Sequence, residues 1–496
     1  MPDFFYSAEE ILREKPANSI NENREKLKKI FHMPQNMDVC LKEFKASDFD
    51  VMLAYIDGLV DSEKLSEAVI KPLIELKEDV SPSDRIGFLK THVLYAPQAS
   101  AAESFGDISR EMLSGICVLF ADNCDQALFI DLRKFPHRPV NRTNNESVVL
   151  GSQEGFVENI RMNISLIRKN IRSADLVTEI MDIGYKNRTK AAIMYIDGTA
   201  DMEIVNEAKR RLKAISDETL MGTGQIQQLI EDHPMSILPQ ILQTERPDRA
   251  AAGLYEGQFA ILTDNSPYAL LGPSTIFHFI HASDDSFMRW QYGMFVRLIR
   301  ILGIVLSLML PGMYIALTQF HSHLIPMNLI SSISEARANV PFSILGEILF
   351  MEFSFHLINE AGTRIPSQIG SALGIVGALI LGQAAVTANI ASPILIIIVA
   401  ITGLGNFVIP SYSLSIGIQI SRLLLLFAGA AFGLYGIVIA LFLMSVSVCA
   451  MRSFGAPYAS PIAPKRPGKG NVIFRMPFGF KRKGAFFEKR KEENSI

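Results

Sequence analysis

Residues 392–409 read SPILIIIVAITGLGNFVI, and they lie within 87 residues between Arg364 and Arg452 in which Arg422 carries the only charge. Water-facing positions of soluble domains normally hold Asp, Glu, Lys and Arg. One such residue at the centre of a transmembrane helix costs about 2.5–3.5 kcal/mol on insertion, so segments in lipid rarely contain them. The sequence therefore predicts that the C-terminal part of the chain lies in a membrane.

Charge divides the chain into three parts that the net charge of −3 conceals. Residues 1–290 contain 32 basic and 44 acidic residues. Residues 291–451 contain 5 basic and 4 acidic residues, and residues 452–496 contain 11 basic and 3 acidic residues. These are an acidic soluble region, an apolar region and a basic tail. The acidic N-terminus has no pattern of a cleaved signal, so we expect the soluble region to remain on the cytoplasmic side.

A duplication organises the soluble region. Tyr55–Gly58 and Tyr195–Gly198 both read Tyr-Ile-Asp-Gly after an apolar run, and a helical pattern follows each. Asp122-Asn123 and Asp264-Asn265 form a second pair, and the two offsets, 140 and 142, nearly agree. We predict two related α/β subdomains, each with a buried strand, an Asp-Gly turn, a helix and a later hairpin at Asp-Asn.

The predicted fold is an α/β soluble N-terminal region of two related subdomains, followed by an all-α polytopic membrane domain. Its parts are an N-terminal helical extension (1–40), subdomain 1 (41–150), subdomain 2 (151–290), a membrane domain of four or five segments (291–451) and a basic cytoplasmic tail (452–496). Phe156, Ile160, Ile164, Ile167 and Ile171 recur at helical spacing and predict a helix connecting the subdomains.

The soluble region shows no motif for catalysis, cofactor binding or metal binding. Asp57 and Asp197 are explained as turn residues, because Asp bonds its own backbone and the following Gly accepts a positive φ. A disulfide between Cys117 and Cys124 could bridge a hairpin, but a cytoplasmic protein favours buried, reduced thiols. We therefore predict a protein that is not an enzyme and holds no cofactor.

An aromatic belt marks where the chain enters the membrane. Trp290 and Tyr292 precede Arg297 and Arg300, and Ile301–Phe320 then runs for twenty residues without charge. Aromatic side chains beside Arg are typical interface anchors, and twenty apolar residues cross about 30 Å of hydrocarbon. Pro311-Gly312 predicts a kink within this span.

Four more apolar stretches follow, at residues 341–358, 369–388, 392–409 and 423–451. The basic tail and the Arg297 end belong on the same side, so the number of crossings is even. One interpretation has four spans, with 341–361 at the outer interface or dipping in and returning. It places residues near 290 and 470 inside and residues near 322 and 415 outside. The alternative has all five stretches crossing, with the last one split near Gly429–Gly436.

Polar residues of the apolar region are the candidates for an ion path. Glu352, His356 and Glu360 share one helical face, with Glu347 away from it, and they either face water at the interface or line an oligomeric pore. Arg422 is expected to snorkel to outer headgroups. Gln383, Asn389 and Asn406 either join helices by hydrogen bonds or line a hydrated path.

Two glycine motifs, Gly370-x-x-x-Gly374 and Gly429-x-x-x-Gly433, permit close helix approach. In the tail, Lys481-Arg482-Lys483 and nearby Phe residues suit anionic lipids better than nucleic acid.

Several motifs together resemble one family. They are Thr244-Glu245-Arg246-Pro247-Asp248-Arg249, Leu324-Ile325-Pro326, Gly382-Gln383-Ala384-Ala385-Val386, Ile409-Pro410-Ser411-Tyr412-Ser413 and Arg452-Ser453-Phe454-Gly455-Ala456-Pro457-Tyr458. Over roughly 150–465 the chain resembles the GerA-type A subunits of spore germinant receptors. Leu150–Phe156, in place of the usual R-G-P-R-E-G-F, and Arg289–Gly293 resemble the stage V sporulation protein AF branch, which argues against direct nutrient sensing.

The resemblance implies a multi-pass protein of the spore inner membrane, with its soluble region and tail on the core side. It also implies a homo-oligomer that works with other germination membrane proteins or germinant receptors. The expected function is an ion-conducting subunit that amplifies the germinant signal by releasing ions. The alternatives are the A subunit of a nutrient receptor, or a scaffold or transporter without channel activity.

Overall fold

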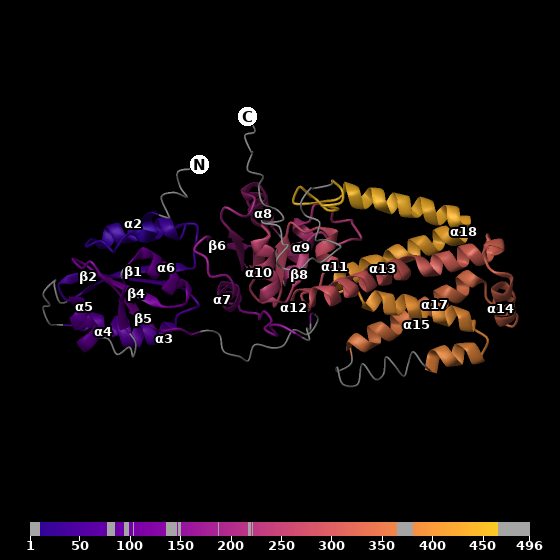
Figure 1. Cartoon of the computed structure of the whole chain (residues 1–496), viewed down its shortest axis with the longest axis horizontal. Coiled ribbons are helices and arrows are strands. Elements are labelled where there is room, and N and C mark those ends of the chain that lie inside the picture. Colours follow the sequence, from indigo (N-terminus) through magenta and orange to yellow (C-terminus); the bar gives the residue numbers. More distant parts are fainter. Residues whose placement is uncertain are drawn as a thin grey trace, which may run out of the picture.

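The computed structural model shows two α/β subdomains followed by a region of long helices (Figure 1). The structure describes residues 10–76, 85–93, 99–102, 104–134, 146, 150–186, 188–216, 220, 222–364 and 380–464. Two predicted features, the Gly370-x-x-x-Gly374 motif and the basic cluster of the tail, lie outside these residues.

Subdomain 1 contains a five-stranded antiparallel sheet with the order β1-β2-β4-β5-β3. Its strands are β1 (Val39–Ala46), β2 (Phe49–Ile56), β3 (Ala99–Ala102), β4 (Cys117–Ala121) and β5 (Ala127–Ile130). Its helical elements are α2 (Ile20–Ile30), α3 (Ser62–Leu65), η1 (Ser66–Ile70), α4 (Lys71–Ile74), α5 (Arg85–Phe88), η3 (Leu89–Val93) and α6 (Phe105–Leu113). Val51 and Leu53 of β2 enter one core while Met52 and Ala54 enter the other, which explains the continuous apolar run of this strand. Cys117 and Cys124 are free thiols.

Subdomain 2 has the same architecture, with the strand order β6-β7-β9-β10-β8. Its strands are β6 (Leu176–Ile183), β7 (Thr189–Ile196), β8 (Leu242–Thr244), β9 (Phe259–Thr263) and β10 (Ala269–Gly272). Its helices are α7 (Ile160–Asn170), α8 (Met202–Ala214), α9 (Thr223–Ile230) and α10 (Pro247–Tyr255). The equal strand orders agree with the duplication that the sequence predicts.

The repeat extends to single side chains. Asn23 of α2 and Asn163 of α7 each exchange two hydrogen bonds with the backbone six residues earlier, at Ala17 and Val157. Both Asp-Gly turns place Gly at a positive φ, and Asn123 and Asn265 are also left-handed. The assignment of Asp57 and Asp197 to turns therefore agrees with the structure.

The first helix of each subdomain has a different role from the one that the sequence predicts. Residues 156–171 were predicted to connect the subdomains, but α7 packs on the sheet of subdomain 2 and contributes Ile164 and Ile167 to its core. Helix α2 is its counterpart, because Leu27 and Ile30 enter a core of subdomain 1. The described part of the predicted extension, residues 10–40, therefore includes a helix of subdomain 1, since α2 packs in that core.

A buried polar cluster joins the two subdomains. Arg168 of α7 donates to both carboxylate oxygens of Asp38, at 2.7 and 2.8 Å, and to Asn36 at 3.0 Å. The Met37 N–H donates to the backbone oxygen of Thr178 on the edge strand β6 at 2.9 Å. Side chains and backbone of subdomain 1 thus pair directly with subdomain 2.

The helical region contains α13 (Trp290–Gln319), η4 (Ser322–Leu324), α14 (Met327–Arg337), α15 (Ile344–Arg364), a helix at 380–387, α17 (Pro393–Phe407) and α18 (Tyr412–Ala450). Two short helices, α11 (Ile276–Ile280) and α12 (Asp284–Phe287), precede it, and a hairpin of β11 (Arg452–Ser453) and β12 (Ala456–Pro457) follows it. Among the described residues, α13 and α18 are the two helices long and apolar enough to cross a membrane. Helix α13 continues through Pro311 to Gln319.

Glycines bring three helices into close contact. A Cβ added at Gly405 of α17 would lie 2.5 Å from the backbone oxygen of Gly303 on α13. A Cβ at Gly429 of α18 would lie 2.7 Å from the backbone oxygen of Gly312. Gly429 therefore acts as the sequence predicts, whereas Gly433 has another role. With φ +63° and ψ −143°, Gly433 breaks α18 into two helices.

The break corrects the predicted topology. The four-span interpretation treated 423–451 as one span and placed residue 415 outside with residue 322. In the structure, Ile409, Leu414 and Met451 share one apolar core with Tyr458 and the soluble region. Gly433 instead lies against Phe320 and His321, so the turn between the two halves of α18 is at the distal end of the helices (Figure 1). The split near Gly429–Gly436 in the alternative interpretation agrees with the break at Gly433, and the number of crossings stays a prediction.

Candidate coupling site between the soluble region and the apolar helices

The motif of residues 244–249 forms the end of a strand and the start of a helix. Pro247 occupies the first turn of α10, where its missing N–H removes no helical hydrogen bond. Arg246 directly precedes the helix and is only 1% exposed. Its guanidinium binds both oxygens of Asp248 at 3.0 and 2.7 Å and donates to the backbone oxygens of Glu146 and Ser152. Arg246 therefore fastens the segment preceding α7 to the start of α10.

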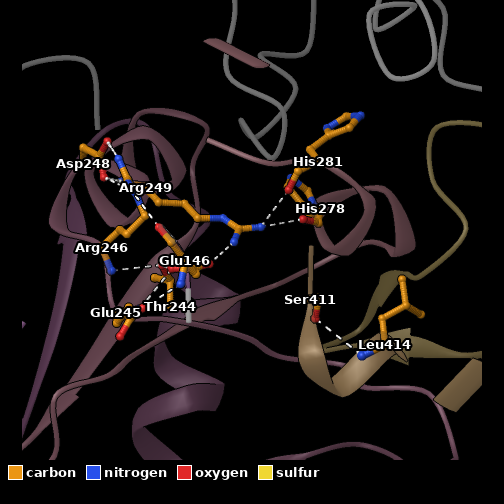
Figure 2. A network of polar contacts seen from close by, with 10 residues as sticks. All are labelled: Glu146, Thr244, Glu245, Arg246, Asp248, Arg249, His278, His281, Ser411 and Leu414. Atoms are coloured by element: carbon orange, nitrogen blue, oxygen red, sulfur yellow. Dashed lines mark hydrogen bonds and ion pairs between the residues drawn. The ribbon is translucent and has the colours of Figure 1, made fainter. Parts of the chain in front are cut away.

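Glu146 is the centre of this network (Figure 2). Its carboxylate accepts hydrogen bonds from the Thr244 hydroxyl at 2.5 Å and from the Glu245 N–H at 3.2 Å. It also forms an ion pair with the Arg249 guanidinium. Its own N–H donates to the Glu245 carboxylate at 2.7 Å. Glu146 is thus bonded to four positions of the motif, which are Thr244, Glu245, Arg246 and Arg249.

Arg249 links the network to the last helices of the soluble region through hydrogen bonds. Figure 2 shows its side chain extending from α10 to the backbone oxygens of His278 and His281, which it binds at 2.9 and 3.0 Å. These carbonyls lie at the C-terminal end of α11, where orphan carbonyls and the helix dipole favour a cation. Arg249 therefore holds α11 against α10.

Two arginines of α13 bind the same short stretch of chain. Arg300 donates to the backbone oxygen of Ile280 at 2.8 Å and to the Asp285 carboxylate at 3.0 and 3.3 Å. Arg297 donates to the same carboxylate at 3.0 Å. Burial alone would raise the pKa of Asp285, but the hydrogen bonds and charges of Arg300 and Arg297 hold this pKa below its usual value. The carboxylate is therefore ionised and bound to the first apolar helix.

The segment after α18 returns to subdomain 2. Ser453 donates to the backbone oxygen of Gln240 at 2.8 Å and accepts from the Ser274 N–H at 3.1 Å. The Phe454 ring meets Phe259 edge-on, with 4.9 Å between centroids. Tyr458 is fully buried, and its carbonyl accepts from the Ile276 N–H at 3.0 Å. The last helix is therefore anchored to the same α/β body as the first.

Apolar contacts complete the joint. Phe279 of α11 and Tyr458 lie in one core with Ile409, Leu414 and Ile418, which flank and begin α18. Ser411 caps α18 by accepting from the Leu414 N–H at 3.4 Å (Figure 2). Because this core also contains residues of α7, α10 and β9, the soluble region and the helix ends form one packed unit.

The structure places two of the predicted pore carboxylates inside the helical bundle. Glu347 is buried, accepts from the Ser392 N–H at the start of α17 and pairs with Arg337 at 3.3 Å. Glu352 is buried and pairs with Arg422 at 2.7 Å. Arg422 was predicted to snorkel to headgroups, and this is wrong, because its side chain is buried against Glu352 in the interior.

The other predicted residues do not form one site. His356 is half-buried with its ring nitrogen 4.0 Å from the Glu352 carboxylate, and Asn406 is buried. Glu360, Gln383 and Asn389 are exposed. Among the anchors, Trp290 and Tyr292 are 39% and 55% exposed, as an interface position requires. Arg297 and Arg300, the predicted interface anchors beside the aromatic residues, both pair with Asp285, and their position at the interface stays a prediction.

The sequence analysis did not identify the acidic partners of Arg249, Arg297 and Arg300, which are Glu146 and Asp285. Asp285 stands 12 and 15 residues before Arg297 and Arg300, a separation that no local helix rule links. Glu146 lies in a polar stretch without a motif. The motif at 244–249 was visible as a family signature, but nothing in its spacing indicated that Arg249 reaches the carbonyls of α11. Among the described residues, no cluster of His, Cys, Asp or Glu could hold a metal ion.

Known proteins resemble almost the whole chain. The chain is 36% identical to spore germination protein KA of Bacillus subtilis over 445 residues, covering 89% of this chain and 82% of that protein. It is 35% identical to spore germination protein B1 of the same organism over 470 residues, covering 93% and 96%. A solved structure, the N-terminal domain of the A subunit of the Bacillus megaterium spore germinant receptor GerK3, matches 53% of this chain and 98% of that chain, with 26% identity and a TM-score of 0.42.

The match to a family covers the soluble region, the motif at 244–249, all the apolar helices and the segment that docks after α18. The sequence pattern described as "Bacillus/Clostridium GerA spore germination protein" matches residues 25–485. Since this is most of the chain, and relatives above 30% identity are covered nearly end to end, the assignment is secure. The chain belongs to the GerA family of spore germination proteins.

Proposed function

We propose that this protein is a multi-pass subunit of the spore inner membrane that assembles into a homo-oligomer and conducts ions during germination, with its soluble region controlling the helices. The family membership supports a role in germination. The apolar length of α13 and α18 supports insertion in a membrane. The protein acts in this proposal without a catalytic step and without a cofactor.

The observation that carries the proposal is the double attachment of the helices to subdomain 2. Arg300 binds Asp285 at the start of α13, and Ser453 binds Gln240 after α18. A signal that moves subdomain 2 would therefore act on the first and last helices together. A scaffold that only recruits partners would not need buried ion pairs at this joint, since exposed surface is enough for recruitment.

The structure narrows the residues that would line an ion path. Glu347 and Glu352 already neutralise Arg337 and Arg422, so they are poor choices for a ring of carboxylates open to water. Glu360, Gln383 and Asn389 are exposed in the single chain, and His356 is half-exposed. We propose these four as the polar groups that face a path between copies, because like residues repeated around an axis concentrate counter-ions.

The proposed orientation places the soluble region and the tail on the core side of the membrane. The basic tail supports it, because positive segments remain on the cytoplasmic side. The helix ends at Trp290, Ile409 and Met451 would then lie toward the core, and the turn at Gly433 toward the outside. Partners in this arrangement are further copies of the chain and other germination membrane proteins.

A second candidate is the A subunit of a nutrient germinant receptor. Membership of the GerA family is equally consistent with this role. The motif differences at 150–156 and 289–293 favour the stage V sporulation protein AF branch instead, in which the chain amplifies a signal received elsewhere. Direct binding of nutrients to the purified chain separates the two, since an amplifier should show none.

The test is ion flux through the purified full chain in liposomes loaded with K⁺ and diluted into Na⁺ buffer. We expect K⁺ release that depends on protein, and a lower rate for Glu360→Gln with unchanged assembly. Glu154→Gln, which alters a half-exposed pair with Lys169, is the matched control. If crosslinking shows oligomers and the liposomes still retain K⁺, with and without other germination proteins, the chain is a scaffold and the proposal fails.

A further inference from the structure

One ion pair inside the helical region leaves several of its polar atoms unused. Arg422 of α18 donates from Nη2 to Glu352 Oε2 of α15 at 2.7 Å, and its Nη1 lies 3.4 Å from the Ser307 hydroxyl of α13. Both charged side chains are only 4% exposed. Within the described part of the chain, neither Glu352 Oε1 nor Arg422 Nε has a hydrogen-bond partner, although both atoms are buried.

Ser307, whose hydroxyl lies 3.4 Å from Arg422 Nη1, also has a backbone carbonyl without its usual partner. In an α-helix the carbonyl of each residue accepts the N–H of the residue four positions later. For Ser307 that residue is Pro311, which has no N–H, so the Ser307 carbonyl receives no helical hydrogen bond. Ser307 is fully buried. A carboxylate oxygen, a guanidinium N–H and a backbone carbonyl from three helices therefore need partners.

The same chain shows how an arginine is satisfied when the protein supplies every partner. Arg168 Nε donates to Asp38 at 2.7 Å, and its other nitrogens reach Asp38, Asn36 and the backbone oxygen of Ser173. That pair is bidentate and as buried as the pair of Arg422 and Glu352. Arg422 differs from Arg168 because its Nε has no hydrogen-bond partner in the described protein. This difference points to another molecule as the partner of Arg422 Nε.

The surroundings limit what that molecule can be. Along α13, close backbone crossings at Gly303 and Gly312 lie on either side of Ser307. Opposite charges of Glu352 and Arg422 cancel, so the place favours neither a cation nor an anion. It offers both donors and acceptors, which a water molecule matches, and buried water typically makes about three hydrogen bonds to otherwise unsatisfied groups.

We propose that Ser307, Glu352 and Arg422 form an internal water-binding site between α13, α15 and α18. Water there accepts from Arg422 Nε and donates to Glu352 Oε1 and to the Ser307 carbonyl. The site stands on this geometry and does not depend on ion conduction.

Solid-state NMR of the full chain in lipid, with ¹⁵N-labelled arginine, tests the site. Magnetisation transferred from water should reach Arg422 Nε faster than Arg168 Nε, which donates to Asp38. Arg422→Lys and Arg168→Lys identify the two signals. Equal, slow transfer from water to both nitrogens would overturn the proposal, because it would show that no water is bound at Arg422 Nε.

A second variant keeps the proposal falsifiable if the arginine variants do not fold. Pro311→Ala returns a helical N–H to the Ser307 carbonyl and so removes one partner of the water. We expect slower transfer to Arg422 Nε in this variant, whereas Ser307→Ala, which keeps Pro311 and the free carbonyl, should change it less. Faster or unchanged transfer in Pro311→Ala would show that the carbonyl is not part of the site.

Discussion

Arg300 Nη1 lies 3.0 Å from the Asp285 carboxylate and 2.8 Å from the Ile280 carbonyl, so one guanidinium of the first apolar helix binds two successive turns at the end of the soluble region. Arg249 binds the neighbouring carbonyls of His278 and His281 from the other side. The chain between α10 and α13 is therefore held by arginines from both directions. These hydrogen bonds join α11 and α12 to α10 and α13, and a substitution of Asp285 tests this connection.

Asp285→Asn should destabilise the joint strongly. The substitution leaves Arg297 and Arg300 buried without a counter-charge, and breaking a buried pair costs about 3–5 kcal/mol. We expect a clear fall in the unfolding temperature of the full chain in detergent, together with loss of germination function in spores. Glu154→Gln, at a half-exposed pair with Lys169, should leave the unfolding temperature nearly unchanged. Equal effects of the two variants would contradict a special role for Asp285.

His32 should make the contact between the subdomains dependent on pH. Its ring nitrogens lie 3.4 Å from Asp175 and 3.5 Å from Asp197, two carboxylates of subdomain 2. The hydrogen bond to Asp175 raises the pKa of His32, burial opposes this, and Asp197 raises it further. A raised pKa in the folded state stabilises the contact below the unfolded pKa of about 6.5, and the gain is lost as pH rises through the folded pKa.

The measurement is the unfolding temperature of the parent and of His32→Asn over a range of pH. Asn tolerates the left-handed backbone that His32 adopts at φ 54°, so the variant removes the charge without adding strain. We expect the largest difference near about pH 5.5 and a small one near about pH 8.5. At low pH the same pair is lost when Asp175, whose pKa is lowered by His32, becomes protonated. A difference independent of pH would refute the ion pair.

Local rules predicted the repeated elements well. The Tyr-Ile-Asp-Gly turns and the Asp-Asn hairpins were visible because turn residues act through their own backbone. The same rules misplaced α7, since an amphipathic helix shows only that one face is buried, and not against which sheet. The repeat itself held the missing information, because Asn23 and Asn163 occupy matching positions in α2 and α7.

Long-range pairs were beyond such rules. Arg422 reads as a lone charge in an apolar stretch, and its partner Glu352 lies 70 residues away on another helix. The prediction of snorkelling failed because it assumed that the charge had to reach water. Gly433 was taken as a contact residue from its spacing with Gly429, although a glycine can equally supply a backbone conformation that other residues avoid.

Gly433→Ala should disturb the turn between the two halves of α18. The backbone there has φ +63° and ψ −143°, a region almost restricted to glycine, and an added Cβ would lie 2.9 Å from the His321 ring and 3.0 Å from Phe320. We expect a loss of about 1–3 kcal/mol, seen as a lower unfolding temperature. Gly346→Ala is the control, because its Cβ would meet only ordinary contacts and alanine favours a helix. A neutral Gly433→Ala would mean that α18 is straight in the membrane.

Cysteine labelling tests the proposed topology with residues that the structure leaves accessible. Leu324 and Phe432 lie at the distal end, near the turn at Gly433, whereas Tyr412 lies beside the soluble region. In a background with Cys449 replaced by Ser, an impermeant thiol reagent added outside intact cells should label Leu324→Cys and Phe432→Cys. It should miss Tyr412→Cys until the membrane is opened. Tyr412 and Phe432 are 72% and 70% exposed, so a difference between them reports the side of the membrane and not burial. Labelling of Tyr412→Cys from outside would restore the four-span order and would separate the start of α18 from the soluble region, against the shared core of Leu414, Ile418 and Phe279.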